Sequence, residues 1–164
     1  MIASKGKWIR PHLAKTIEGV PPVDPDPVPD IVLRDPSNWA KVNHGMQQVV
    51  HGARGTARVA GVGAQYLIAG KSGTAQVVAI KQGEKYDRSK VQERHRDHAL
   101  FVGFAPANNP QITVSVMIEN GEAGSRVASP VVRKVMDAWL LGEDGKLKPE
   151  YGGPVKAEVP ANDE

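Results

Sequence analysis

Residues 98–120 read HALFVGFAPANNPQITVSVMIEN, and this stretch decides the fold. Its two halves are apolar runs of strand length, and the segment between them, PANNP at 106–110, is a strong turn signal. In the second half, apolar residues alternate with a mixed set, which is typical of a strand with one buried face. The sequence therefore predicts two successive strands, over residues 99–105 and 111–119.

A third strand and a charged loop precede these two strands. Residues 66–78, YLIAGKSGTAQVV, favour a strand by their residue types. Residues 81–98 carry many charges and no apolar period, so a loop is expected there. This loop is either a plain hairpin connection or the rim of an active cleft.

Two helices are expected to pack on the strands. The first begins near Asp35-Pro36-Ser37 and ends at Gly52, and the second begins with Ser129 as its cap and Pro130 at its first position. Their apolar residues recur at three- and four-residue steps and predict buried faces. These residues are Trp39, Val42, Met46, Val49 and Val50 in the first helix and Val131, Val132, Val135, Met136, Trp139 and Leu140 in the second. Three antiparallel strands with helices packed on them make an α+β fold.

The two ends of the chain are expected to be less regular. The first residues read as the end of a helix closed by Gly6, followed by an extended stretch over 8–17. Residues 21–30 hold five prolines and read as a stiff surface linker. Residues 142–164 are polar and contain Gly and Pro, so we expect a folded domain over 1–141 and a disordered tail over 142–164.

Composition and charge exclude several classes of protein. The chain has 164 residues, of which 40% are hydrophobic and 24% charged, as in a globular domain or a piece of one. The formal net charge of +3 is too small to indicate nucleic-acid binding. The absence of Cys excludes disulfides, cysteine-ligated zinc and a thiol nucleophile. No apolar run approaches the roughly 20 residues that a membrane-spanning helix needs.

The candidate functional site is the tetrad Lys71-Ser72-Gly73-Thr74. Gly70 and Gly73 lack a Cβ atom, so a ligand or another backbone can approach this strand closely. Lys71 adds a positive charge at the same place. The combination suits an extended anionic ligand that lies along a strand edge, held by main-chain hydrogen bonds and by charge.

Two other interpretations of the tetrad are a phosphate loop and a lysine without a functional role. A phosphate loop needs a glycine five residues before Gly70, where the sequence has Gln65, and a helix after the lysine, where the residue types continue a strand. Alternatively, Lys71 is a surface lysine in a glycine-rich strand and has no functional role.

The ordered set of segments resembles the C-terminal part of class B penicillin-binding proteins, most closely the penicillin-binding protein 2 group of elongation transpeptidases. The resemblance covers roughly residues 1–141. It rests on ASKGKWIRPHLAKTI (3–17), AGKSGTAQVV (69–78), HALFVGFAPANNPQITVSVMIEN (98–120) and the terminal helix.

The resemblance implies a D,D-transpeptidase, which cross-links peptidoglycan stem peptides by serine acyl transfer and is acylated by β-lactams. Lys71 would bind the terminal carboxylate of the stem peptide or of a β-lactam and assist proton movement. The backbone N–H of Thr74 would be an oxyanion-hole donor. Ser72, Gly73 and Thr74 would complete the substrate-binding strand, although alternation puts both hydroxyls on the face opposite Lys71. No cofactor or metal is implied.

The resemblance also implies a cellular setting. The intact enzyme would be anchored in the inner membrane with this domain in the periplasm, beside glycan-polymerising and elongation-complex proteins, with no role for nucleic acid. A non-catalytic β-lactam-sensing or scaffolding domain is the alternative function.

The chain lacks other parts that the family needs. A Ser-x-Asn is absent, and the one Ser-x-x-Lys, from Ser4 to Lys7, is interpreted as a coincidence of a short pattern. Because the family's nucleophile lies far upstream, this chain alone is expected to be inactive and to need the upstream part of the domain. The last strand would pair with an upstream strand, so its free edge is expected to aggregate or to bind a second polypeptide.

The histidines do not form a metal site in the sequence. His95 and His98 lack a third ligand at suitable spacing, so exposure to solvent is expected. His44 and His51 lie two turns apart on the first helix and are expected to pack or to face solvent.

Overall fold

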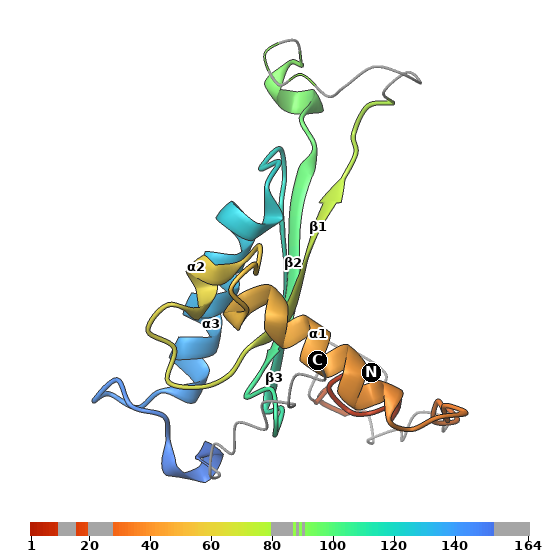
Figure 1. The fold of residues 1–164 in the computed structure, drawn as a ribbon, viewed down its shortest axis with the longest axis vertical. Helices are drawn as coiled ribbons and strands as arrows, with labels where there is room; N and C mark the ends of the chain where they lie inside the picture. The colour runs from red at the N-terminus through yellow and green to blue at the C-terminus, as the bar shows by residue number, and fades with distance from the viewer. Residues whose placement is uncertain (10–15, 20–27, 80–86, 88, 90, 153–164) are drawn as a thin grey trace, which may run out of the picture.

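The fold is built on an antiparallel sheet of three strands in the order β1-β2-β3 (Figure 1). This computed structural model describes residues 1–9, 16–19, 28–79, 87, 89 and 91–152. The strands are β1 (Ala69–Ala75), β2 (His98–Ala105) and β3 (Ile112–Ile118). The expected α+β fold with three antiparallel strands is confirmed, although β1 is shorter at both ends than the sequence predicts.

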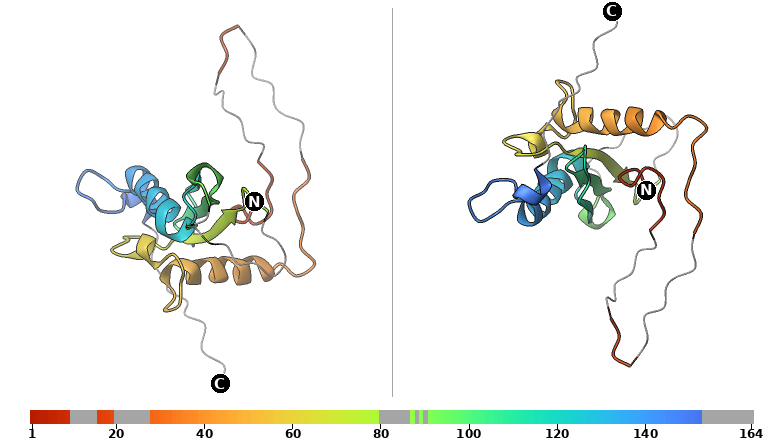
Figure 2. Two further views of the ribbon diagram at one scale, coloured as in Figure 1. Left: turned by 90° about the horizontal axis from the view of Figure 1, so that it is seen from above. Right: turned by 90° about the horizontal axis from the view of Figure 1, so that it is seen from below.

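Helices flank the sheet. They are α1 (Asn38–His51), α2 (Arg58–Gly61) and α3 (Ser129–Leu140), with short helical turns η2 (Glu93–His95), η3 (Gly124–Ala128) and η4 (Pro149–Tyr151). Figure 2 shows α1 and α3 on opposite sides of the sheet.

The face of the sheet that α3 covers holds the main core. Phe101 of β2 is buried there with Val132, Met136 and Leu140 of α3. Gly70 makes this packing possible, because a Cβ atom on it would lie 2.5 Å from the Phe101 ring. The core also takes in Val50 of α1, so α1 joins this layer at its C-terminal end.

The opposite face is covered only at the start of β1. There Ala69, Phe104 and Ala107 form a second cluster, against which Met46 of α1 packs. Further along this face, Val102 of β2 is 41% exposed and Met117 of β3 is 58% exposed. Apolar residues of the sheet therefore remain uncovered by the described part of the chain.

The first helix begins where the sequence predicts, but the helices differ from the sequence interpretation in two other places. Asp35 accepts a hydrogen bond from the Ser37 N–H (2.9 Å) at the start of α1, and hydrogen bonds from the Ser37 side chain and then from this N–H lower the pKa of the Asp35 carboxyl. Ser129 does not cap α3: its hydroxyl is buried and donates to the Ser125 carbonyl (2.7 Å), because the turn η3 runs directly into the helix. Val42 of α1 is 45% exposed, outside the predicted buried face.

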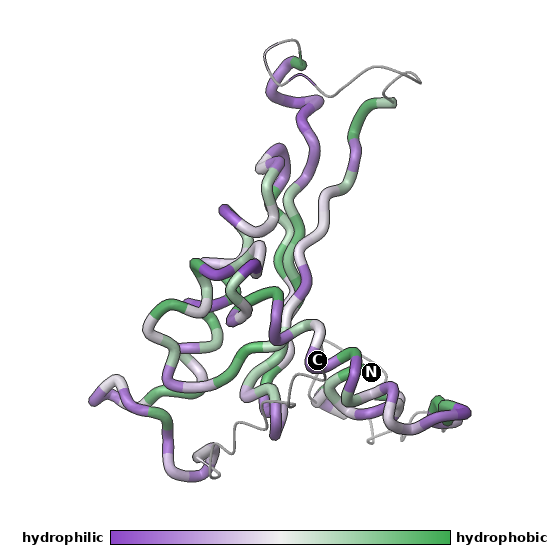
Figure 3. Tube along the Cα trace, in the orientation of Figure 1, coloured by the Kyte–Doolittle hydropathy of each residue, from purple (hydrophilic) through white to green (hydrophobic). Residues whose placement is uncertain are grey.

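The predicted apolar stripe of α3 is only half buried. Val132, Met136 and Leu140 lie in the core, but Val131, Val135 and Trp139 are exposed. Figure 3 shows hydrophobic residues gathered along the middle of the strands, whereas the segment leading into β2 is hydrophilic. Among the residues described, no helix has the length and apolar character needed to cross a bilayer.

The two ends of the chain are partly described. Gly6 adopts a φ of +96° and closes a turn over residues 1–6. Most of the extended stretch and of the proline-rich linker, and residues 153–164, lie outside the described residues. In the segment expected to form a tail, Leu147 pairs with Leu141, and Leu147 and Tyr151 pack against the core.

Candidate functional site

The tetrad lies in the middle of β1, at an edge of the sheet. Within the described residues β1 pairs only with β2, with Lys71 opposite Val102 and Gly73 opposite Leu100. Lys71 and Thr74 are exposed, and Ser72 and Gly73 are half-buried. The side of β1 away from β2 is therefore open.

The backbone of the tetrad presents a carbonyl and an N–H to this open edge. The Lys71 ammonium reaches the Ser72 carbonyl oxygen (2.6 Å), which places that oxygen at the edge. Along an antiparallel strand, the backbone groups of alternate residues point the same way. The Thr74 N–H therefore points to the same edge as the Ser72 carbonyl.

The side chains of the tetrad divide between the two faces of the sheet. Ser72 lies opposite Phe101, a buried residue of the α3-covered face, and Thr74 shares that face by alternation. The Thr74 hydroxyl donates to the Glu122 carbonyl there (3.3 Å). Lys71 lies opposite Val102, on the other face. The ammonium thus approaches the edge from one face and the hydroxyls lie on the other, as strict alternation predicts.

Side chains of α1 and α3 hold the residues that lead into β1. The Tyr66 hydroxyl donates to the Asp137 carboxylate (2.7 Å), and Arg133 binds the same carboxylate (2.8 Å). Burial, and then the neighbouring carboxylate, raise the pKa of Tyr66 well above its usual value. The Ile68 N–H donates to Nε2 of His51 (2.9 Å). Hydrogen bonds from two helices therefore fix where β1 begins.

The partial burial of His51 makes stability depend on pH. Burial, and next the charge of Arg133, lower the pKa of His51 below its usual value of about 6.5. Because the native state favours neutral His51, its contribution is complete above pH 6.5 and is lost as the pH falls towards the lowered pKa. We expect the melting temperature to fall by a few degrees between pH 7.5 and pH 5.

A pair of variants isolates this effect in thermal unfolding curves. His51→Gln can accept the same bond without titrating, so this part of the pH dependence should disappear. His44→Gln, on the exposed side of the same helix, should leave it unchanged. An identical pH slope in His51→Gln and in the unchanged protein would contradict the assignment.

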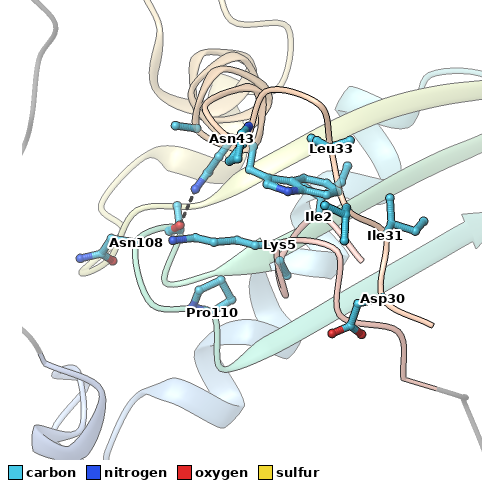
Figure 4. Close-up of a pocket in the computed structure, with 14 residues that line it drawn as sticks. Ile2, Lys5, Asp30, Ile31, Leu33, Asn43, Asn108 and Pro110 are labelled. Atoms are coloured by element: carbon cyan, nitrogen blue, oxygen red, sulfur yellow. Dashed lines mark hydrogen bonds between the residues drawn. The ribbon is translucent and has the colours of Figure 1, made fainter. Parts of the chain in front are cut away.

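A hollow of about 610 Å³ lies beside the N-terminal half of α1 (Figure 4). Its wall includes Trp39, Ile31 and Lys5, and Asn43 donates to the Ala107 carbonyl at its rim (2.8 Å). None of its lining residues belongs to the tetrad, so this hollow and the candidate site are separate. Ser4 lies in the turn beside it, with its hydroxyl 2.6 Å from the Lys7 carbonyl oxygen.

Two other sequence interpretations can be compared with the structure. The phosphate-loop interpretation is wrong. The lysine is followed by the rest of β1, which ends at Ala75, and residues 76–79 form no helix. His98 is half-buried, and its Nδ1 accepts a bond from the Asn120 N–H (3.0 Å). Across the described residues, no three His, Asp or Glu side chains gather into a group that could hold a metal ion. Part of the loop 81–98 lies outside those residues.

Comparison with known proteins identifies the family. The model of the penicillin-binding protein transpeptidase domain matches residues 1–137. This chain therefore belongs to the penicillin-binding protein transpeptidase domain family, and the resemblance stated from the sequence is confirmed.

Individual relatives agree with this assignment. Peptidoglycan D,D-transpeptidase MrdA of Haemophilus influenzae is 43% identical over 143 residues, which cover 85% of this chain and 22% of that protein. The crystal structure of Pseudomonas aeruginosa PBP2 in complex with WCK 5153 is 69% identical with a TM-score of 0.78, covering 93% of this chain and 31% of that one. Helicobacter pylori PBP2, solved in complex with MreC, is 27% identical with a TM-score of 0.52, and the match covers 65% of this chain and 18% of that one. The chain spans less than a third of each of these proteins.

Proposed function

We propose that this chain is the C-terminal part of a peptidoglycan D,D-transpeptidase and supplies its substrate-binding strand. The observation that carries the proposal is the open edge of β1. There the Ser72 carbonyl and the Thr74 N–H face outward next to the Lys71 ammonium. An extended peptide that ends in a carboxylate can add to such an edge through main-chain bonds, with its charge bound by the lysine.

The proposed reaction is acyl transfer through a serine. The serine oxygen attacks the carbonyl between the two terminal D-alanines, a C–O bond forms, and the C–N bond breaks. The released D-alanine takes the serine proton. An amine of a neighbouring stem peptide then attacks the same carbonyl, a new C–N bond forms, the C–O bond to serine breaks, and an amine proton returns to the serine oxygen. The Thr74 N–H would stabilise the negative oxygen in both steps, and Lys71 would bind the carboxylate and assist the proton transfer. The Ser72 and Thr74 hydroxyls would reach the carboxylate only by turning round the edge.

The nucleophile would come from the upstream part of the same domain. Three surfaces that the described residues leave uncovered support this inference: the outer edge of β3, the exposed row of α3, and the face of the sheet with Val102 and Met117. An upstream strand beside β3 and upstream helices on the other two surfaces would bury them. The short share of the relatives that this chain spans agrees with such a division.

The cellular setting is part of the proposal. We place the domain in the periplasm, on a protein anchored in the inner membrane by a segment outside this chain. The complex of Helicobacter pylori PBP2 with MreC supports an elongation-complex partner of that kind. A glycan-polymerising protein is the second proposed partner.

Turnover of a stem peptide tests the proposal against a β-lactam sensor or scaffold. The whole protein that carries this segment should release D-alanine from a pentapeptide ending in D-Ala-D-Ala and form cross-linked product with an acceptor. A sensor would be labelled by a fluorescent penicillin but would release no D-alanine. Labelling without D-alanine release would therefore reject the transpeptidase.

A further inference from the structure

A tight turn contacts the end of the tetrad that carries the proposed oxyanion donor, the Thr74 N–H. The turn comprises residues 120–124, which follow β3 and end at the first residue of η3, and we call it the 120–124 turn. The Glu122 carbonyl in this turn accepts a hydrogen bond from the Thr74 hydroxyl (3.3 Å). Thr74 and Glu122 are 48 residues apart in sequence, so the contact depends on the tertiary fold.

One buried residue holds this turn in place. Asp97 is 7% exposed, and its carbonyl accepts the Glu122 N–H (2.9 Å). The carboxylate of the same residue accepts the N–H of Val77 (3.3 Å), just past the end of β1. Asp97 therefore joins the end of the tetrad strand to the turn that contacts Thr74.

The turn has a conformation that needs such support. Asn120 and Glu122 have φ values of 59° and 61°, in the left-handed region that residues other than glycine seldom adopt. The Asn120 N–H is bound by Nδ1 of His98 (3.0 Å), next to Asp97 in the chain. Bonds to two successive residues thus stabilise a backbone that is unfavourable on its own.

Gly124 brings the turn into direct contact with the tetrad. A Cβ atom on Gly124 would collide with the Leu100 carbonyl oxygen and lie 2.7 Å from that of Gly73. The Gly73 carbonyl and the Thr74 N–H belong to one rigid peptide group. A displacement of the turn therefore moves the group that would bind the oxyanion.

We propose that Asp97 is a positioning residue for acyl transfer: its carboxylate holds the end of β1 at Val77, its backbone carbonyl holds the 120–124 turn, and both contacts set the position of the Thr74 peptide group. The inference rests on the proposed function. Asp97 directly precedes β2, which pairs with β1 on the side away from the open edge, so it would not contact the substrate. Its role would be to keep the Thr74 N–H at the position that the developing negative charge needs, where a shift of about 1 Å can cost 100-fold in rate.

The test measures acylation of the whole transpeptidase by a fluorescent penicillin, with active sites counted by end-point labelling. Saturation kinetics separates the non-covalent dissociation constant from the acylation rate constant. For Asp97→Ala we expect the rate constant to fall about tenfold or more, with the dissociation constant within about twofold. Asp97→Asn keeps an oxygen acceptor for Val77 and should stay within about threefold of the unchanged protein.

A matched control separates positioning from stability. Tyr66→Phe loses a largely buried hydrogen bond at the other end of β1, so it should lower the melting temperature and leave the acylation rate constant unchanged. If Asp97→Ala gives no folded protein, Gly124→Ala tests the other contact, between the 120–124 turn and the Thr74 peptide group, because its methyl group displaces that turn. An unchanged rate constant in a folded Asp97→Ala or Gly124→Ala variant, or an equal loss in Tyr66→Phe, would overturn the inference. If the whole protein without any substitution is not labelled by the fluorescent penicillin, the proposed function itself is rejected.

Discussion

Replacing Lys71 by alanine in the whole transpeptidase should lower the second-order rate constant for acylation by penicillin by about 100-fold or more. The lysine is the only cation of the tetrad, and its ammonium already lies at the open edge, 2.6 Å from the Ser72 carbonyl. Removing one partner of a desolvated, hydrogen-bonded charge pair costs about 2–5 kcal/mol. Since about 1.4 kcal/mol corresponds to tenfold, a loss of this size follows directly.

Two further variants make this result specific. Lys41→Ala removes an equal charge from an exposed pair with Asp35 and should change the rate constant by less than about twofold. Lys71→Arg keeps the charge but not the shape of an ammonium, so it should recover part of the activity. Equal rates for Lys71→Ala and Lys41→Ala would show that Lys71 does not bind the carboxylate.

The second large effect concerns the chain by itself. The 164-residue chain is expected to show no covalent labelling by a fluorescent penicillin under conditions that label the whole transpeptidase completely. The proposed oxyanion donor and carboxylate-binding lysine would not form an acyl-enzyme without a nucleophile. Gel fluorescence after denaturation measures this, because only a covalent adduct survives.

Ser4 provides the control for this experiment. Its hydroxyl lies close to backbone carbonyls of its own turn, 3.1 Å from Met1 and 2.6 Å from Lys7. Labelling of the isolated chain that disappears in Ser4→Ala would make Ser4 the nucleophile and overturn this account. Light scattering on the same sample tests the free β3 edge, since a monodisperse monomer with a protected β3 would argue against an exposed pairing edge.

The sheet and its pairing could be predicted from local patterns. The alternation from Ile112 to Ile118 and the proline-bounded turn before it are signals within one short segment, and the structure has β2 and β3 there. The limits of β1 could not be predicted. Tyr66 and Ile68 have the residue types of a strand but bind Asp137 and His51 instead, and such partners are not visible in the segment itself.

The tetrad was visible in the sequence, but its support was not. Lys71 and the glycines beside it form a recognisable local pattern, whereas Asp97 lies in a charged segment where acidic residues are usually solvated. The bonds of Asp97 to Val77 and Glu122 depend on long-range contacts. The one signal in the sequence was Gly124, a glycine just before the last helix, and it acquires meaning only from its contact with Gly73.

The groups that β1 presents at its open edge are mainly peptide groups, and this limits how the protein can evolve away from an inhibitor. Every residue type has a backbone carbonyl, and every type except proline has a backbone N–H. A point mutation at Ser72 or Thr74 therefore seldom deletes the contact itself. On the proposed function, resistance at this edge would have to arise by shifting the strand, through residues such as Gly124 that contact it, and the same shift would weaken binding of the proposed peptide substrate.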